Sequence, residues 1–131
     1  MDYQFLMDKA IEASKNSYSP YSHFAVGACV LGESGNYYYG CNFENSSFGL
    51  TICAERNAIG NAIANGEKQI KAIAIFSPNM EDCFPCGACR QVIADTEKRQ
   101  GAPIRLILCG ACSATVVESA RALLPFTFEL E

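Results

Sequence analysis

Hydrophobic residues at helical spacing open the chain. Over residues 3 to 14 they recur three and four positions apart, on one face of a helix, at Tyr3, Leu6, Met7, Ala10 and Ile11. The polar stretch "NSYSPYS" follows and ends the pattern. The sequence therefore predicts a first helix over residues 3 to 14.

Two strands are predicted next. The runs "HFAVGACVLG" (23–32) and "NYYYGCNF" (36–43) are rich in apolar and aromatic residues, and "GESG" between them is typical of a turn. We expect these runs to pair as a hairpin. A polar loop, "ENSSFGL" (44–50), then leads away from the second strand.

The rest of the chain alternates between helices and strands. A helix is predicted from near Cys53 to Asn65, where Asn65-Gly66 is a good stop, and another from Gly87 to about Lys98. The strands are "IKAIAIFSP", "PIRLILC" and "ATVVES". The last two are separated only by "GACS", so they should be antiparallel. A short helix and an aromatic tail, "SARALLPFTFEL", close the chain. This order predicts an α/β fold, a mixed sheet covered by helices.

Composition narrows the class of protein. A chain of 131 residues suits one domain, residues 1–131. Half of its residues are apolar and only 18% are charged, which suggests that part of the surface is buried in a homo-oligomer. The net charge of −4 argues against a nucleic-acid binder. The first ten residues carry charges that do not fit a secretion signal, and the apolar runs are too short to cross a membrane. We expect a cytoplasmic protein.

The chain has eight cysteines, which could form a disulfide framework. The long helix and strand patterns between the cysteines argue against a small fold held together by disulfides. In a reducing compartment, cysteines at short fixed spacing are more often metal ligands or catalytic thiols.

Three of these cysteines fall at the starts of two predicted helices. Cys53 lies at the first start, and Cys86 and Cys89 flank the second. A helix N-terminus lowers the pKa of a thiol, and the thiolate is the form that binds metal. If the sheet brings the two helix starts together, three sulfurs meet at one point. Three protein ligands leave the fourth position of a zinc ion open, as in catalytic zinc sites.

Glu55 follows Cys53 by two residues and shares a helix face with Ile59 and Ala62. Burying a carboxylate on the apolar face of a helix costs free energy unless a polar or charged partner inside the protein interacts with it. We therefore interpret Glu55 as a proton carrier beside the metal and not a ligand. The plainer alternative is that Glu55 only favours the helix dipole.

Two arginines each follow a proposed ligand directly. Arg56 and Arg90 could donate hydrogen bonds to the sulfurs and offset the negative charge of three thiolates on Zn²⁺. The alternative is an ordinary solvent-facing side chain, and it fits Arg90 better than Arg56.

A structural zinc site is the rival interpretation. Cys86 and Cys89 are followed by Cys109 and Cys112, which gives the C-x₂-C…C-x₂-C pattern of a closed Cys₄ site. Cys83 adds a further C-x-x-C with Cys86. Such a protein would be a binding module, and Cys53 and Glu55 would have no role in it.

Several motifs together resemble one family. "CAER" followed by "PCGACRQ" matches the three-cysteine form of the zinc deaminase signature. With "YSPYSHFAVGA", "GCNFENSSFGLTICAERNAI" and "LLPFTF", the chain is similar to short, homotetrameric cytidine deaminases over nearly its whole length. The resemblance implies a three-layer α/β/α fold with a five-stranded mixed sheet.

The resemblance also implies roles for residues. Zn²⁺ would be bound by Cys53, Cys86 and Cys89, with Glu55 moving protons. Cytidine and 2′-deoxycytidine would be hydrolysed to the uridine products and ammonia, in pyrimidine salvage. The nucleoside would be held by Asn42 and Glu44 at the ribose, Phe24 at the pyrimidine, Ala54, and Phe128, which could come from a neighbouring subunit. No nucleic-acid polymer and no membrane would take part.

The chain departs from the family pattern at two positions. Phe48 stands where tyrosine is frequent, and Phe84 where a small polar residue is usual. Both bear on the fit of the substrate, and a modified cytosine nucleoside is the alternative substrate. His23, the only histidine, receives no chemical role.

Overall fold

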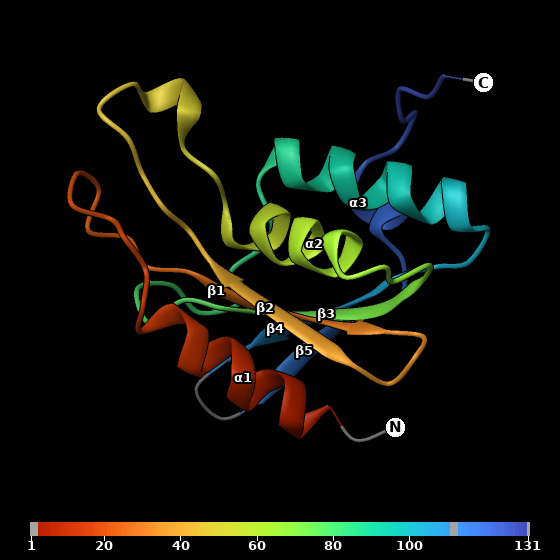
Figure 1. Cartoon of the computed structure of the whole chain (residues 1–131), viewed down its shortest axis with the longest axis horizontal. Coiled ribbons are helices and arrows are strands. Elements are labelled where there is room, and N and C mark those ends of the chain that lie inside the picture. Colours follow the sequence, from red (N-terminus) through yellow and green to blue (C-terminus); the bar gives the residue numbers. More distant parts are fainter. Residues whose placement is uncertain (1–2, 111–112, 131) are drawn as a thin grey trace.

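A five-stranded mixed sheet runs through the centre of the molecule, with helices on both of its faces (Figure 1). The structure is a computed structural model, and it describes residues 3–110 and 113–130. In chain order the elements are α1 Gln4–Ser14, β1 Gly27–Gly32, β2 Tyr37–Cys41, the 3-10 helix η1 Phe48–Leu50, α2 Ala54–Ala64, β3 Ile70–Phe76, α3 Gly87–Gln100, β4 Arg105–Cys109, β5 Ala114–Val117 and the 3-10 helix η2 Ala120–Leu123.

The strand order is β2-β1-β3-β4-β5. Strands β3 and β4 are parallel, because α3 carries the chain back across the sheet between them, and every other neighbouring pair is antiparallel. The predicted hairpin of β1 and β2 and the antiparallel pairing of β4 and β5 are both confirmed. The α/β class with a mixed five-stranded sheet is confirmed as well.

The sheet has two different faces because side chains alternate along each strand. In β3, Ile73 and Ile75 pack with α2 and α3, while Ala72 and Ala74 face α1. Helix α1 therefore lies alone on one face, and α2 and α3 cover the other (Figure 1). This is the three-layer arrangement that the resemblance implied.

The small residues on the α1 side allow a close approach. Gly27, the first residue of β1, lies under α1, where an added Cβ would be 2.1 Å from the carbonyl oxygen of Ala10 and 2.4 Å from the amide nitrogen of Ser14. Only glycine fits at this contact.

The structure differs from the prediction in four details. Strand β1 begins at Gly27 and not at His23, because His23 takes a left-handed conformation with φ +58° and the amide of Val26 bonds to the side chain of Asn42. The loop after β2 contains η1, and the last helix is a 3-10 turn. Helix α3 runs two residues beyond Lys98 to Gln100, and Gly101 follows as its C-cap with φ +70°.

The helices of the described part of the chain are 14 residues long at most. None of them has the length and apolar character needed to cross a membrane.

Candidate active site

Three cysteine sulfurs meet at the starts of α2 and α3. Cys53 and Cys86 are the N-cap residues of the two helices, and Cys89 is the third residue of α3. The sulfur of Cys86 lies 3.7 Å from that of Cys53 and 3.6 Å from that of Cys89, and all three lie within 4.8 Å of one another. The helix starts meet as the sequence led us to expect.

The spacing of the sulfurs fits a metal ion. Zn–S bonds of about 2.3 Å in a tetrahedral arrangement place any two sulfurs ~3.8 Å apart. The two distances from Cys86, 3.7 Å to Cys53 and 3.6 Å to Cys89, are close to that value. Three thiols fill three corners, and within the described residues no fourth cysteine, histidine or carboxylate joins the group. The residues present therefore fit a zinc ion with one open position.

One of the three thiols, that of Cys53, lies in surroundings that favour its negative charge. A hydrogen bond from Cys89, together with the Arg56 guanidinium, lowers the pKa of Cys53 to about 5. The pKa of Cys89 is raised in turn, because its thiol donates to Cys53 and is buried. A divalent cation would release the protons that remain, since thiolates are the ligand form.

Arg56 is the arginine that reaches a sulfur. Its Nη2 lies 3.5 Å from the sulfur of Cys53 and 3.4 Å from the carbonyl oxygen of Thr51. Its Nε is buried and has no hydrogen-bond partner among the residues that the structure describes. Arg90 turns away instead, donating to the carbonyl oxygens of Pro85 at 2.8 Å and Leu123 at 3.1 Å.

Glu55 is buried, with 4% of its surface exposed, at the second position of α2. Burial raises the pKa of its carboxyl group to about 7, and the negative charge of Cys53 adds to the effect. A carboxyl group in this range can accept a proton and return it near neutral pH.

A pocket of about 260 Å³ joins the thiols to the polar groups of two loops. Its walls combine apolar side chains, among them Phe24 and Phe84, with carboxylates and an amide. The lining is Ser22, Phe24, Val26, Asn42, Glu44, Thr51, Cys53, Ala54, Glu55, Cys83, Phe84 and Cys86. The pocket lining includes the proposed proton carrier, two of the three proposed metal ligands and four of the five proposed substrate-binding residues. The two that do not line it are Cys89, whose sulfur contacts that of Cys86, and Phe128.

Asn42 and Glu44 are already bonded within the chain. The side-chain oxygen of Asn42 accepts from Ser17 Oγ at 2.5 Å and from the amide of Val26 at 2.9 Å, and its nitrogen donates to the carbonyl oxygen of Phe24 at 2.8 Å. Glu44 accepts from the loop at residues 21–22, and the Ser22 hydroxyl lowers the pKa of its carboxyl group. One N–H of Asn42 and one lone pair of Glu44 remain for a ligand.

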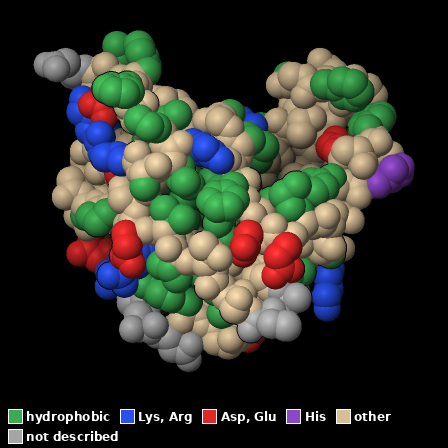
Figure 2. Space-filling model, turned by 180° about the vertical axis from the view of Figure 1, so that it is seen from behind, with side chains coloured by type: hydrophobic (Ala, Val, Ile, Leu, Met, Phe, Trp, Pro, Cys, Tyr) green, Lys and Arg blue, Asp and Glu red, His purple; other side chains and the backbone are tan. Residues whose placement is uncertain are grey.

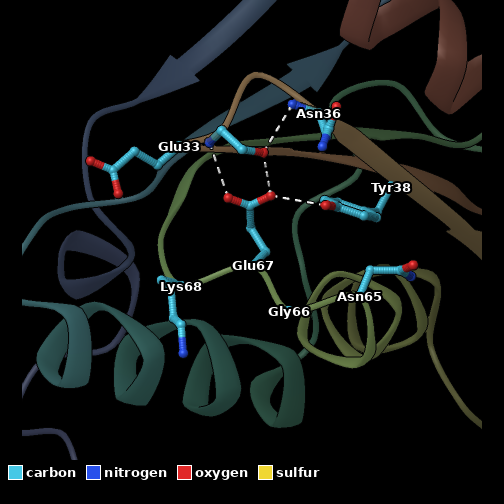
Figure 3. Close-up of a pocket in the computed structure, with 8 residues that line it drawn as sticks. Glu33, Asn36, Tyr38, Asn65, Gly66, Glu67 and Lys68 are labelled. Carbon is cyan, nitrogen blue, oxygen red and sulfur yellow. Dashed lines mark hydrogen bonds between the residues drawn. The ribbon is translucent and has the colours of Figure 1, made fainter.

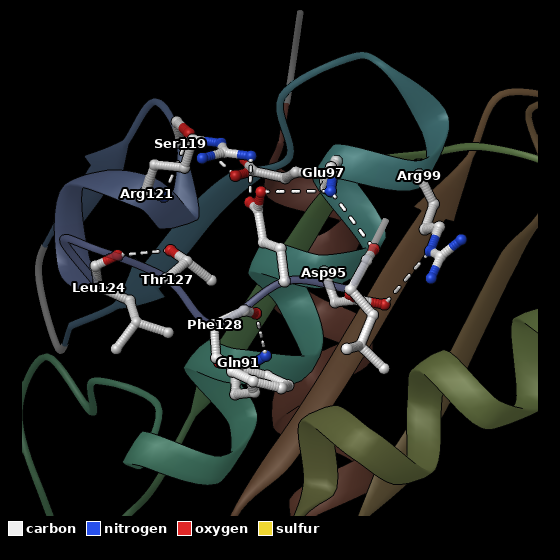
Figure 4. A network of polar contacts seen from close by, with 12 residues as sticks. Gln91, Asp95, Glu97, Arg99, Ser119, Arg121, Leu124, Thr127 and Phe128 are labelled. Carbon is white, nitrogen blue, oxygen red and sulfur yellow. Dashed lines mark hydrogen bonds and ion pairs between the residues drawn. The ribbon is translucent and has the colours of Figure 1, made fainter.

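Phe128 lies in the C-terminal segment beside α3, away from the pocket. Its carbonyl oxygen accepts from Gln91 Nε2 at 2.9 Å (Figure 4), while its side chain is 69% exposed. In a single chain this ring does not close the site.

The rival zinc site does not assemble from the described residues. Cys109 is buried at the end of β4, in the cluster on the α1 face of the sheet. Cys53, Cys86 and Cys89 gather at the starts of the helices that cover the opposite face. Cys112 lies outside the described residues.

A larger hollow of about 360 Å³ lies elsewhere, beside the β1–β2 hairpin and the end of α2 (Figure 3). There Glu67 accepts hydrogen bonds from the amide and hydroxyl of Ser34 and from the hydroxyl of Tyr38. This carboxylate ties the hairpin to the end of α2, and none of the three site cysteines is near it. The hollow is a structural feature of the hairpin.

Sequence reasoning missed the serines that support the site. Ser17 and Ser22 bond to Asn42 and Glu44 across more than 20 residues of chain. Cys83, Val26 and Thr51 also line the pocket without having been assigned to it. The only signal was that both serines lie in or beside the "YSPYSHF" motif.

The fold, the thiol cluster and the buried carboxylate define a deaminase of the zinc-binding class. Residues 1–101 match the family model described as the cytidine and deoxycytidylate deaminase zinc-binding region. Cytidine deaminase from Sporosarcina psychrophila is 45% identical over 95 residues, covering 72% of this chain and 70% of its own. That from Halalkalibacterium halodurans is 46% identical over 95 residues, with 72% of each chain covered.

Solved structures agree. The crystal structure of cytidine deaminase from Burkholderia pseudomallei matches with a TM-score of 0.88 and 37% identity, covering 98% of this chain and all of that one. Cytidine deaminase from Mycobacterium tuberculosis matches with a TM-score of 0.81 and 33% identity, over 99% of both chains. The chain belongs to the cytidine deaminase family and is an enzyme, a hydrolase.

Proposed function

We propose that the chain catalyses the zinc-dependent hydrolysis of cytidine and 2′-deoxycytidine to uridine and 2′-deoxyuridine. Cys53, Cys86 and Cys89 would hold the zinc ion, and Arg56 would offset the charge of their thiolates. One observation supports this proposal above all. Three sulfurs spaced for a tetrahedral metal adjoin a pocket that also contains a buried carboxylate, Glu55.

When bound, zinc would make a water molecule acidic enough to lose a proton near neutral pH. Glu55 would take this proton and deliver it to N3 of the cytosine ring, which makes C4 electrophilic. The oxygen of the water adds to C4. Glu55, now deprotonated, would take the remaining proton from the new hydroxyl group on C4 and pass it to the amino group. The C4–N bond would then break, ammonia would leave, and the oxygen would remain as the C4 carbonyl group of the uracil ring. The sum is one water consumed and one ammonia formed for each uridine nucleoside.

The remaining pocket residues would bind the nucleoside. Phe24 and Ala54 offer apolar walls for a pyrimidine ring. Asn42 has one N–H left to donate and Glu44 one lone pair left to accept, and a sugar hydroxyl, which both donates and accepts, complements such a pair. These contacts would place the base against Glu55.

We further propose that the chain is one domain over residues 1–131 and assembles as a tetramer in the cytoplasm, where it serves pyrimidine salvage. Apolar side chains are exposed in η1, within the loop between β2 and α2, and in the C-terminal segment: Phe48, Leu50, Phe126, Phe128 and Leu130. Figure 2 shows apolar side chains scattered over one face, with the molecule hollowed between its projecting parts. Phe128 would close the site of a neighbouring subunit. Sedimentation equilibrium should give four chain masses, and a monomer would contradict the assembly.

Zinc content separates the catalytic site from the structural alternative. The wild type and Cys109→Ala should each retain about one zinc ion per chain, while Cys53→Ala should lose it. Zinc lost with Cys109 and kept without Cys53 would support the structural site instead.

Ammonia release from both nucleosides tests the reaction itself. Glu55→Gln should fold and keep zinc but lose turnover by a factor of at least ~10². A fully active Glu55→Gln protein rules out the proposed proton carrier.

A further inference from the structure

Two loops meet beside the pocket and are held together by polar side chains. Backbone hydrogen bonds pair Tyr18 with the segment around Phe43, from the amide of Tyr18 to Asn42 at 3.0 Å and from the amide of Glu44 to Tyr18 at 2.9 Å. The side chains of Asn42 and Glu44 add further hydrogen bonds between the two loops. The residues expected to bind substrate therefore also shape the loop that carries Phe24.

Ser22 stands at the centre of these ties. Its hydroxyl donates to Glu44 Oε2 and accepts from the amide of Phe24 at 3.0 Å. The amide of Ser22 and that of Tyr21 donate to the other carboxylate oxygen at 3.1 and 2.9 Å. One hydroxyl thus connects Glu44 with Phe24, the two residues placed at the two parts of a nucleoside.

The backbone between these contacts is strained. His23 lies between Ser22 and Phe24 with φ +58°, a left-handed conformation that costs about 1 kcal/mol or more for a residue other than glycine. The Ser22 hydroxyl closes this turn by accepting from the amide of Phe24. The turn sets the direction in which Phe24 leaves the loop.

We propose that Ser22 is a positioning residue for substrate binding, which acts by fixing the Glu44 carboxylate and the Phe24 ring in one arrangement. The proposal rests on the proposed function. Ser22 bonds neither to the cysteine sulfurs nor to Glu55, so its removal should weaken binding and leave the chemical step intact. Without the hydroxyl, Glu44 keeps the two amide donors on one carboxylate oxygen but loses the donor on the other, and the amide of Phe24 loses its acceptor.

The kinetic test compares Ser22→Ala with Ser22→Thr and Ser46→Ala. Ser22→Ala should raise KM for cytidine about tenfold, the loss typical of a hydrogen bond to a charged group, with kcat changed less than about twofold. Ser22→Thr keeps the hydroxyl and should restore KM. Ser46 is the matched control, because its hydroxyl bonds to Tyr21 at 2.7 Å in the same pair of loops but does not reach Glu44. Ser46→Ala should behave like the wild type.

A double-mutant cycle tests whether Ser22 acts through Glu44. In a Glu44→Gln background, Ser22→Ala should raise KM by a much smaller factor than in the wild type. Equal factors in both backgrounds, or an unchanged KM in a folded Ser22→Ala protein, overturn the proposal while the deaminase reaction stands. If Ser22→Ala does not fold, Ser22→Gly replaces it in the same cycle. A wild type that deaminates no cytosine nucleoside overturns the proposed function and the role of Ser22 together.

Discussion

The buried carboxylate of Glu97 joins three parts of the C-terminal half (Figure 4). Its Oε2 accepts hydrogen bonds from the amides of Ile104, just before β4, at 2.7 Å and Ala120, in η2, at 3.0 Å. Ser119 Oγ donates to the same carboxylate at 3.0 Å. Glu97 is 4% exposed, and Ile104 and Ala120 are buried as fully. The two amides are therefore buried together with their acceptor.

The cost of removing Glu97 follows from its partners. In Glu97→Ala, two buried amides lose their acceptor, and each unsatisfied group costs about 1–3 kcal/mol. The free energy of unfolding should therefore fall by about 2–6 kcal/mol, a large part of the 5–15 kcal/mol typical of a domain. Glu97→Gln keeps one oxygen that can accept from both amides, so its loss should stay below about 1 kcal/mol.

Urea unfolding followed by far-ultraviolet circular dichroism measures these differences, at fixed protein concentration and zinc loading. Glu118→Ala is the matched control, because Glu118 makes an exposed ion pair with Arg105 at 2.7 Å and its loss should change stability by less than about 0.5 kcal/mol. The reasoning is refuted if Glu97→Gln costs as much as Glu97→Ala, since the charge and not the acceptor would then matter. A loss below about 1 kcal/mol for Glu97→Ala refutes it as well.

Three further outcomes are expected. Gly27→Ala should lower the stability of the protein by about 2 kcal/mol or more in thermal unfolding, because the added Cβ would meet the backbone of α1. Gly60→Ala is the control and should not lower it, because the Cβ there would meet open space. The Ser34 hydroxyl lowers the pKa of Glu67 from its ordinary value of 4.5. At pH values above 4.5 the wild type should therefore be more stable than Glu67→Gln by its full margin, and the margin should shrink as the pH falls below 4.5. A difference in stability that does not depend on pH would contradict this. Removing zinc with a chelator should lower the melting temperature and abolish ammonia release, and zinc should restore both; full activity of metal-free protein would exclude the metal.

Hydrophobic periodicity was sufficient to predict the order of the elements. The alternation of Ile and Ala in β3 reflects a strand buried on both faces, and such patterns are local. The start of β1, in contrast, is not determined by local sequence. Val26 is apolar and looks like part of the strand, but the side chain of Asn42, from beyond β2, takes its amide. No pattern within residues 23–32 could show that.

The site divides in the same way. The meeting of Cys53, Cys86 and Cys89 and the burial of Glu55 were predictable because both depend on position near a helix start, which sequence shows. The different behaviour of Arg56 and Arg90 was not, since both follow a cysteine and only the path of the chain turns Arg90 toward Pro85 and Leu123. The partners of Asn42 and Glu44 depend on which loops meet, a tertiary contact between distant segments.

Both helices that carry the site begin without an ordinary cap. Cys53 and Cys86 occupy the N-cap positions, and neither side chain makes a capping hydrogen bond to the helix that it precedes. Serine or aspartate there would stabilise each helix by about 1 kcal/mol. The sulfurs instead lie 3.7 Å apart, at the positive ends of both helices. A metal bound to these thiolates would stabilise the native state alone, so its binding would offset the stability that the missing caps lose. The stability of the helix starts and the assembly of the site would then be coupled through the same two residues.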